Sequence, residues 1–302
     1  PYPPAPPDFG GAARIYNLLW QLQQRCDLTV FSLLGDGEDA SEAERTFDRM
    51  VTARVPMTAR RPASLAKRSA QVRSALSRRS FQYRFYWHAE AQRVLNALLE
   101  RERFDIVQIE FSQMAYYETP GNAKRVVDLH NVEHDVLQQA SARGSLPKRL
   151  FNAREWRKLR REEEQVWRTA DLCLATSETD ARRVRNVTGD ECLVVPNGVD
   201  DNYFKRQPLD TATPGAMVFT GAMRYQPNAD AVTYFVRRVW PLVRDLEPEA
   251  TFTIVGADPP EEVARLGEIA GVHVTGSVDD VRPWLGSSSV VVVPLLAGGG
   301  TR

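Results

Sequence analysis

The sequence predicts an α/β protein of two domains, each built on a parallel sheet with helices between its strands. Short apolar runs rich in β-branched residues alternate with helical stretches, which is the order of repeated βαβ units. Several of these runs are apolar at consecutive positions, as is typical of strands buried on both faces of a parallel sheet. The 302 residues also suffice for two domains of ordinary size.

The predicted strands are short runs bounded by turn residues or by charged stretches. In chain order they are Leu28–Leu34, Asp105–Phe111, Arg125–Leu129, Leu172–Ala175, Cys192–Val195, Met217–Thr220, Thr251–Val255, Val272–Thr275 and Val290–Leu296.

The clearest helical stretches lie between these strands. Gly10 and Gly11 open the first one, which is expected over Ala12–Gln24. Residues 61–103 are helical in composition and little interrupted. Leu146–Thr169 is expected to be a long charged helix, with a proline near its start, where proline is tolerated.

A segment rich in Asn, Asp, Pro, Thr and Gly, Pro196–Gly215, predicts the linker between the domains. It divides the chain into an N-terminal domain, residues 1–205, and a C-terminal domain, residues 206–302. Both ends are expected to be cut. A strand should precede the first helix, and the turn after Leu296 should open a further helix.

Composition disfavours several classes of protein. The formal net charge is zero, so no global field attracts nucleic acid. No apolar run approaches the length of a membrane span. The cysteines, Cys26, Cys173 and Cys192, are odd in number and widely spaced, which indicates reduced thiols in the cytoplasm rather than a disulfide framework or a metal cluster.

Unusual residues follow several predicted strands: His130-Asn131, Pro196-Asn197-Gly198, Gly221 to Arg224, and Gly298-Gly299-Gly300-Thr301. In parallel sheets, ligands bind beyond the carboxyl ends of the strands, where helix N-termini offer backbone amides. Glycines, which have no Cβ, let a phosphate approach the backbone closely. Neither G-x-G-x-x-G nor G-x4-G-K-[ST] is present, so an NAD-dependent fold and a P-loop nucleotidase are disfavoured.

Several of these segments resemble the family-four retaining glycosyltransferases of the GT-B fold, and the most similar group is a bacterial one associated with exopolysaccharide production. The opening Pro1-Tyr-Pro-Pro, with Asp8-Phe-Gly-Gly11, is similar to the loop after that family's first strand. The other segments that carry the resemblance are 176–181, 194–200, 219–228, 253–257, 274–279 and 293–301. Together they cover most of the chain.

The resemblance implies two Rossmann-like domains that face a central cleft. It implies a nucleoside diphosphate sugar as donor, a glycan or lipid-linked acceptor, retention of configuration and no metal. Arg224 would neutralise the diphosphate and His130 would lie beside the sugar, and these two are the implied catalytic residues. The implied donor-binding residues are Gly10, Gly11, Asn197, Gly198, Gly221, Val278, Gly298, Gly299, Gly300 and Thr301.

The sequence departs from the family pattern at two places. A lysine expected shortly after Arg224 is missing from residues 226–228, which read Gln-Pro-Asn. The first glutamate of a Glu-x7-Glu motif falls at Gly299, and the second would lie beyond Arg302. The first carboxylate is therefore replaced.

His130-Asn-Val-Glu133-His134 also fits H-x-x-E-H, the pattern of the inverted zinc proteases. Zinc would require both histidines on one helix face. Because His130 follows directly on a predicted strand, the zinc interpretation is disfavoured. Glu133 and His134 are instead expected in the first turn of a helix, where its dipole favours a carboxylate.

Residues 54–84 contain nine Arg or Lys and no Asp or Glu. If residues 61–87 form one helix, its apolar side chains make a single stripe. Such a basic amphipathic helix suits an anionic membrane surface. A helix packed on the core with a solvated arginine face has the same pattern. The apolar stripe consists of Leu65, Val72, Leu76, Tyr83 and Trp87.

Two other functions remain open at this stage. A sugar-nucleotide epimerase shares the predicted fold but needs acid and base carboxylates beside the sugar. A non-catalytic two-lobed sugar-binding protein has similar βαβ units and would carry an export signal.

Overall fold

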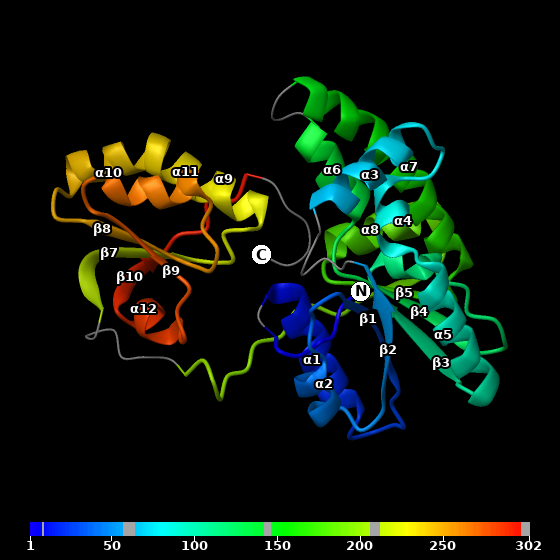
Figure 1. Ribbon diagram of the computed structural model, residues 1–302. Helices are drawn as coiled ribbons and strands as arrows, with labels where there is room; N and C mark the ends of the chain where they lie inside the picture. The colour runs from blue at the N-terminus through cyan, green and yellow to red at the C-terminus, as the bar shows by residue number, and fades with distance from the viewer. Residues whose placement is uncertain (8, 57–63, 142–145, 206–211, 297–302) are drawn as a thin grey trace. The chain divides into compact units, whose positions relative to one another are not determined.

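The computed structural model describes all residues except 8, 57–63, 142–145, 206–211 and 297–302 (Figure 1). The chain divides into two compact units, the first spanning Pro1–Gly198 and the second beginning at Val199. The boundary expected between residues 205 and 206 falls in the same connecting segment. Each unit is a Rossmann-like arrangement of parallel strands and intervening helices, as the sequence predicts. The expectation that the units face a cleft stays a prediction.

The first unit contains two parallel sheets, one of two strands in the order β1-β2 and one of four in the order β3-β4-β5-β6. Its elements are α1 (Gly10–Leu22), β1 (Val30–Gly35), α2 (Ser41–Thr46), β2 (Met50–Val55), α3 (Ser64–Ala75), α4 (Phe81–Tyr86), α5 (Ala89–Arg101), β3 (Ile106–Glu110), η1 (Ser112–Tyr116), β4 (Lys124–Leu129), α6 (Glu133–Ser141), α7 (Leu146–Thr169), β5 (Leu172–Ala175), α8 (Glu178–Thr188) and β6 (Cys192–Val194).

Strand β2 is absent from the sequence-based prediction. Its sequence, MVTARV, mixes polar and apolar residues because β2 is an edge strand. Only Ala53 and Val55 are fully buried, so the continuous apolar run that marks a two-faced strand is missing. Of the strands described in this unit, β2 is therefore the one that the sequence did not predict.

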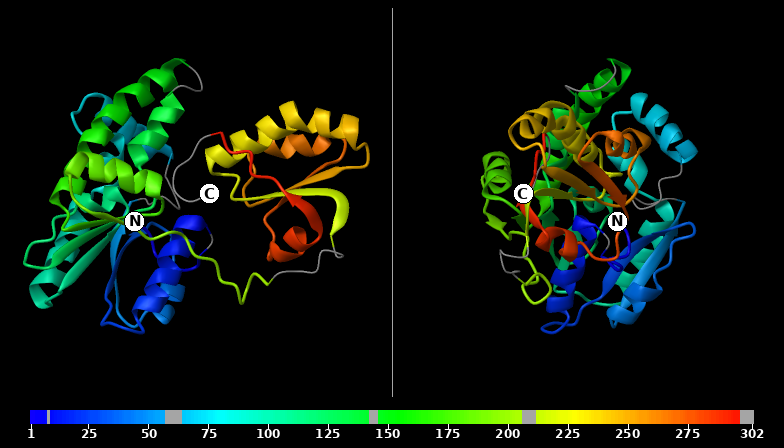
Figure 2. Two further views of the ribbon diagram at one scale, coloured as in Figure 1. Left: turned by 180° about the vertical axis from the view of Figure 1, so that it is seen from behind. Right: turned by 90° about the vertical axis from the view of Figure 1, so that its left-hand side faces the viewer.

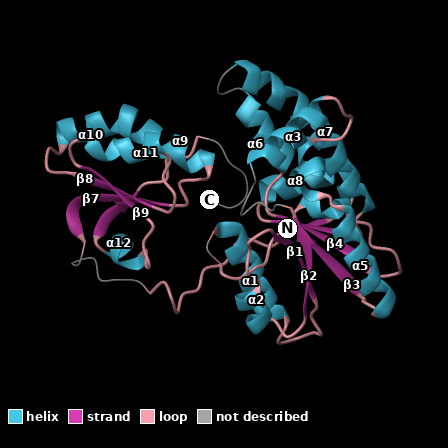
Figure 3. Cartoon of the chain, in the orientation of Figure 1, coloured by secondary structure: helices cyan, strands magenta, loops and turns pink. Residues whose placement is uncertain are grey.

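The helical composition predicted for residues 61–103 is confirmed from residue 64 onward, where the structure describes the chain, but the single helix expected to carry the apolar stripe over residues 61–87 is wrong. The segment forms α3, α4 and α5, separated by short breaks (Figure 3). Ser80 interrupts it, because its hydroxyl accepts a hydrogen bond from the Tyr83 amide at 3.1 Å and so begins α4 as an N-cap. Trp87, in extended conformation, ends α4. The apolar stripe assigned to 61–87 therefore does not lie on a single helix.

Helices cover both faces of the β1-β2 sheet. On one face Val30 packs with Ile15 and Leu19 of α1 and with Phe47 after α2. On the other face the β1 and β2 side chains join α5 in a second cluster that continues over β3, β4 and β5. Helices α6 and α7 run side by side, with α3 and α4 next to them (Figures 1 and 2).

The second unit is a single parallel sheet in the order β10-β7-β8-β9. Helices α9, α10 and α11 lie along one face and α12 along the other (Figure 1). Its elements are β7 (Thr213–Thr220), α9 (Gln226–Tyr234), the π-helical turn η3 (Phe235–Val239), α10 (Trp240–Leu246), β8 (Thr251–Val255), α11 (Glu261–Ala264), η4 (Arg265–Glu268), β9 (Val272–Gly276), α12 (Arg282–Gly286) and β10 (Ser288–Val291).

The core of this unit is aromatic, with Phe235, Trp240 and Phe252 in mutual contact. The π-helical turn lies immediately before Pro241, whose missing amide and ring disfavour a continuous α-helix there. Strand β10 covers Ser288–Val291 rather than the predicted Val290–Leu296, since Pro294 cannot continue the ladder. No helix among the described residues is long and apolar enough to cross a membrane.

Candidate functional site

The N-terminus of α1 carries two adjacent glycines with different surroundings. A Cβ on Gly10 would meet no atom of the described residues within 4 Å, and Gly10 is exposed. A Cβ on Gly11 would lie 2.7 Å from the Tyr2 hydroxyl and 3.1 Å from the Phe111 ring. Gly11 is thus required for packing, whereas Gly10 leaves room for a ligand at the positive end of the helix dipole.

Arg14, on the next turn of α1, is the centre of a buried network. Its guanidinium donates to both carboxylate oxygens of Asp128, at 3.0 and 3.1 Å. It also donates to the Asn197 side chain at 3.0 Å and to the Pro196 carbonyl at 3.3 Å. Arg14 therefore ties α1, the end of β4 and the segment after β6 together. Asn197, predicted to bind donor, accepts from Arg14, and Gly198 next to it is exposed.

The imidazole of His130, directly after β4, is buried and positioned from two sides. Its Nε2 lies 2.8 Å from a Glu110 carboxylate oxygen, and Gln108 donates to the other oxygen at 2.7 Å. The Phe111 ring stacks on the imidazole with centroids 3.8 Å apart. Phe111 has a φ of 69°, a region that non-glycine residues rarely occupy. This backbone conformation, at the end of β3, lets the ring reach the imidazole.

Burial alone would raise the pKa of Glu110, but the hydrogen bond and charge of His130, with Gln108 and Arg14, hold that pKa below its ordinary value. For Asp128 the balance is reversed. Burial and the negative charge of Glu110 raise its pKa despite Arg14. The two carboxylates thus differ in proton affinity although both lie at the carboxyl ends of neighbouring strands.

Among the residues that the structure describes, one group could hold a metal: ligand atoms of Glu110, Asp128 and His130 lie within 4.8 Å of one another. These atoms already interact within the protein, since His130 contacts Glu110 and Arg14 binds both oxygens of Asp128. A cation there would have to compete with a buried guanidinium. The arrangement therefore favours a positioned imidazole over a metal centre.

The zinc-protease interpretation of residues 130–134 lacks the required geometry. His130 follows strand β4 and faces Glu110, whereas the Nδ1 of His134 lies 2.7 Å from Glu163 on α7. Glu163 also accepts the backbone amides of Glu133 and His134, at 3.2 and 2.8 Å, and so caps α6. Placing Glu133 and His134 in the first turn of a helix is confirmed.

Glu133 lies beside this cap with an altered acidity. Burial, followed by the negative charge of Glu163, raises its pKa to about 7. Gln82 donates to it weakly, at 3.4 Å. The sequence pattern does not predict this rise in the pKa of Glu133, because Glu163 lies on α7, thirty positions further along the chain.

In the second unit, the loops after β7 and β8 are in close contact. The Gly221 amide donates to the Val255 carbonyl at 3.0 Å. A Cβ on Gly256 would lie 1.8 Å from the Gly221 carbonyl oxygen, and one on Gly221 would lie 2.7 Å from the Asn228 side chain. Asn228, in the stretch where the family resemblance expects a lysine, donates instead to the Ala222 carbonyl at 3.0 Å. Gly221 is thus required because a larger side chain would collide with Asn228.

Arg224 extends from this packed loop into solvent. Its side chain is 44% exposed and lies 3.3 Å from the carboxylate of Asp258, which is 65% exposed. Asp258 follows β8 and has a φ of 53°. The structure thus places a partly solvent-exposed guanidinium at the carboxyl end of the sheet, in an ion pair with Asp258.

Val278, predicted to lie along the nucleobase, is half-buried in the loop after β9. Next to it lies a cluster that the sequence did not indicate. The Arg282 guanidinium stacks on the Tyr203 ring at 3.9 Å and is hydrogen-bonded to Asp280 at 3.0 Å. The predicted donor residues Gly298, Gly299, Gly300 and Thr301 lie outside the described residues.

The thiols of Cys173 and Cys192, on neighbouring strands, are buried, and burial raises their pKa values to about 12 and about 11. They are therefore poor nucleophiles at neutral pH. Cys26, by contrast, is exposed.

Comparison with known proteins gives a consistent result for both units. Residues 9–203 match the family model described as Glycosyltransferase Family 4, and residues 214–302 match the model described as Glycosyl transferases group 1. A search of curated proteins found no match.

Solved structures share this fold at low sequence identity. A sucrose-phosphate synthase from Thermosynechococcus elongatus has a TM-score of 0.66 and 14% identity, covering 97% of this chain and 73% of that one. The trehalose-6-phosphate synthase OtsA has a TM-score of 0.55 and 13% identity, covering 95% and 75%. An E. coli trehalose-6-phosphate protein described as bound with UDP-2-fluoro glucose has a TM-score of 0.56 and 12% identity, covering 97% and 77%.

Proposed function

Because the chain belongs to glycosyltransferase family 4 and has the GT-B fold of two Rossmann-like domains, we propose that it transfers a sugar from a nucleoside diphosphate donor to an acceptor hydroxyl with retention of configuration. The acceptor is a glycan or a lipid-linked glycan of the cell envelope or an exopolysaccharide. The reaction takes place in the cytoplasm.

The observation that carries this proposal is the exposure of Arg224 beyond the carboxyl ends of β7 and β8, the two central strands of the sheet. A diphosphate is a bidentate anion that a guanidinium binds well, and its negative charge grows as the glycosidic bond breaks. The ion pair between Asp258 and Arg224 is long and solvated and contributes little stability. Exchange of Asp258 for a diphosphate is therefore energetically accessible.

The acceptor oxygen bonds to the anomeric carbon, the bond from that carbon to the diphosphate oxygen breaks, and the acceptor proton passes to the departing diphosphate on the same face. No protein nucleophile is needed. This agrees with the contacts of the two carboxylates beside His130, because Glu110 is hydrogen-bonded to His130 and Asp128 to Arg14. Glu110 and Phe111 would keep the imidazole of His130 in one orientation towards a sugar hydroxyl.

Membrane association is supported by a surface made of residues 72–84 and 146–157. Val72, Leu76, Leu146 and Leu150 are between 62% and 86% exposed there. The only acidic side chain in these two stretches, Glu155, is buried. The exposed cations are Arg73, Arg78, Arg79, Arg84, Lys148, Arg149, Arg154 and Arg157. Exposed leucines among cations suit an anionic lipid surface, where each cation contributes about 1 kcal/mol.

The test of the reaction is incubation with nucleoside diphosphate sugars, uridine diphosphate sugars first, with and without a glycan acceptor extract. Release of nucleoside diphosphate that depends on acceptor is expected. An isomerised donor without acceptor would instead identify an epimerase, and binding without turnover would identify a sugar-binding protein.

The test of the membrane surface is co-sedimentation with vesicles. Binding to vesicles containing anionic lipid should exceed binding to neutral ones, and the double variant R78E/R79E should lose most of this difference. A matched control, R237E/R238E, changes two exposed arginines on η3 and should bind as the parent does. Equal binding to both kinds of vesicle would remove the membrane from the proposal.

A further inference from the structure

The helices of the first unit surround a cavity for which the proposed reaction has no use. Its volume is about 380 Å³, within the range of roughly 300–1,000 Å³ that small-molecule sites occupy. Residues of α3, α4, α6 and α7 line it. Most of the lining is apolar or aromatic, from Phe81, Phe85, Tyr86, Leu137, Phe151 and Leu159.

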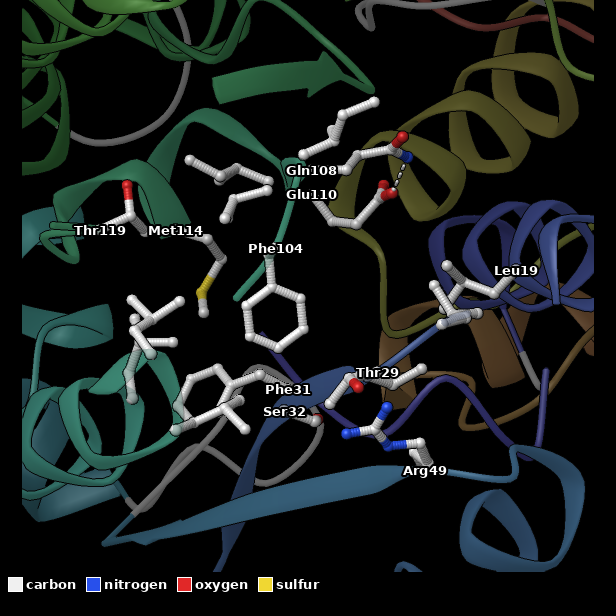
Figure 4. A pocket seen from close by; sticks show the side chains of 18 of the residues that line it. Leu19, Thr29, Phe31, Ser32, Arg49, Phe104, Gln108, Glu110, Met114 and Thr119 are labelled. Atoms are coloured by element: carbon white, nitrogen blue, oxygen red, sulfur yellow. Dashed lines mark hydrogen bonds between the residues drawn. The ribbon is translucent and has the colours of Figure 1, made fainter. Parts of the chain in front are cut away.

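A larger cavity in the same unit, of about 520 Å³, adjoins the site already described (Figure 4). Figure 4 shows Gln108 and Glu110 in its lining, joined by a hydrogen bond. Glu110 in turn contacts His130. The smaller cavity shares no lining residue with the larger one in the part of the chain that the structure describes, so it is a separate feature.

Glu155 is the one charged side chain among the described residues that line the smaller cavity, and its charge is compensated within the protein. The carboxylate accepts hydrogen bonds from the Lys158 ammonium at 2.5 Å, the Phe81 amide at 2.6 Å and the Ser74 hydroxyl at 2.7 Å. Both Glu155 and Lys158 are buried. Because a paired and hydrogen-bonded carboxylate presents little net charge, the cavity suits an apolar occupant.

A cation lies on the cavity-lining face of α7. Phe151 and Asn152 are the first residues of this helix that line the cavity. Lys148, which is exposed, precedes them by three and four positions and so shares their face one turn earlier. The exposed leucines and cations proposed to contact lipid belong to the same two segments of the chain, residues 72–84 and 146–157.

These features together fit an amphiphile with one apolar chain and an anionic end. A chain inside the cavity would be removed from water by apolar and aromatic walls, and an ammonium on the adjoining turn is a partner for a phosphate. A lipid-free glycan would instead use the carboxamides of the lining, those of Gln71, Gln82 and Asn152. Such a ligand would give no role to the leucines and cations beside the cavity.

We propose that this cavity binds the apolar chain of a lipid phosphate, with the phosphate at Lys148. The inference deepens the proposed function and rests on it, because the lipid phosphate would be the carrier part of a lipid-linked acceptor. The surrounding surface would hold the protein on the membrane, whereas the cavity would take up the chain of one lipid. Selection of the acceptor then depends on its carrier as well as on its glycan.

The test is calorimetric titration of hexyl, octyl and decyl phosphate, each below its micelle concentration, into the parent protein. Affinity should rise by about 2- to 4-fold with each added methylene, because each is removed from water in the cavity. Inorganic phosphate and octanol each lack one half of the amphiphile. Both should bind at least about 10-fold more weakly than octyl phosphate.

Leu137→Trp, which places an indole in the cavity, should weaken octyl phosphate binding by about 10-fold or more and remove the dependence on chain length. Gln71→Trp fills the cavity from α3 and serves if the first variant lowers the melting temperature. The matched control is Leu246→Trp, at a leucine 83% exposed on α10 of the second unit, which should bind as the parent does. Lys148→Glu should weaken octyl phosphate by about 5-fold or more and leave octanol binding unchanged.

Equal affinity for octyl phosphate in the parent and in both cavity-filling variants would overturn the proposal. A lipid-free oligosaccharide whose binding those variants abolish, while octyl phosphate binding persists, would overturn it in favour of a glycan site. Failure of the proposed function is seen separately, because the titration requires neither donor nor turnover. The cavity-filling variants should also keep their preference for anionic vesicles, which separates the cavity from the membrane surface.

Discussion

Each unit places an arginine and an aspartate near the carboxyl ends of its strands, but the two pairs differ in nearly every physical respect. In the first unit, Arg14 and Asp128 lie 3.0 Å apart with side chains only 4% and 0% exposed. In the second, Arg224 and Asp258 lie 3.3 Å apart and are 44% and 65% exposed. The same two residue types therefore serve different purposes.

The buried pair, Arg14 and Asp128, connects α1 with β4 and stabilises the fold. Its guanidinium has several partners from β4 and the segment after β6, and removal of one partner would leave a charge in a low-dielectric interior. The exposed pair is a solvated contact worth about 0–1 kcal/mol, so a ligand phosphate can replace the carboxylate at little cost. Burial, rather than residue type, separates the arginine that holds the fold from the one proposed to hold the donor.

The largest expected effect is on stability. Asp128→Ala should lower the free energy of unfolding by about 3–5 kcal/mol, because Arg14 would remain buried without its carboxylate. Denaturant titration measures this. The matched variant Asp258→Ala should cost no more than about 1 kcal/mol, most of it from placing alanine at a φ of 53°. Equal losses in the two variants would contradict the distinction between the pairs.

The next effect is on catalysis. Arg224→Ala should lower kcat/KM by about 100- to 1000-fold, as expected for the loss of a group that stabilises developing charge, while the melting temperature stays within about 2 °C. Arg265→Ala, which removes an exposed arginine elsewhere in the same unit, serves as the control and should keep full activity. Near-normal turnover of Arg224→Ala would remove this residue from the mechanism.

The sequence predicted the strands of the second unit, and the loops that follow them, better than the network in the first. Runs such as Met217–Thr220 are apolar at nearly every position and so indicate buried strands, and Gly221 and Arg224 lie in the segment that follows this run. Arg14, by contrast, is one charge in an apolar helix, and its partner Asp128 lies within a predicted strand. Arg14 and Asp128 lie more than a hundred positions apart in the chain, so their contact is visible only in the folded structure.

The same limit explains the other differences. Strand β2 was not predicted because an edge strand needs few apolar residues, and the break between α3 and α4 depends on one serine cap. Glycines near strand ends and helix starts were interpreted as room for a phosphate, and for Gly10 this stays a prediction. Gly11 and Gly221 are instead required by neighbouring side chains, a cause that no local pattern reveals.

A smaller effect concerns the pH dependence of stability in the first unit. The pKa of Glu133 is raised from 4.5 to about 7, so between these values the folded state holds a proton that the unfolded state has lost. Stability should therefore fall as pH rises through this window and level off above about pH 7. Glu133→Gln should remove this slope and stabilise the protein by about 1–3 kcal/mol at pH 8, as measured by denaturant titration.

The control for this prediction is Glu262→Gln, which changes an exposed carboxylate on α11 of the second unit and should keep the slope. A Glu133→Gln protein with the same pH dependence as the parent would show that Glu133 is not the group responsible.

The smallest expected effect is that of metal removal. Since Arg14 and His130 already engage the carboxylates of the one candidate group among described residues, prolonged treatment with EDTA should leave activity unchanged within about 20%, and calorimetric titration with zinc should give no tight site. Loss of activity that Zn²⁺ or Mg²⁺ restores would contradict the proposed metal-free mechanism.

The most direct test of the central claim is calorimetric titration of nucleoside diphosphates, uridine diphosphate first, into the parent protein and into Arg224→Ala and Asp258→Ala. Loss of the arginine should weaken binding about 10-fold or more, whereas loss of the aspartate should leave it equal or tighter, because the guanidinium no longer has to leave a carboxylate. Equal affinity in all three proteins would show that Arg224 does not bind the diphosphate.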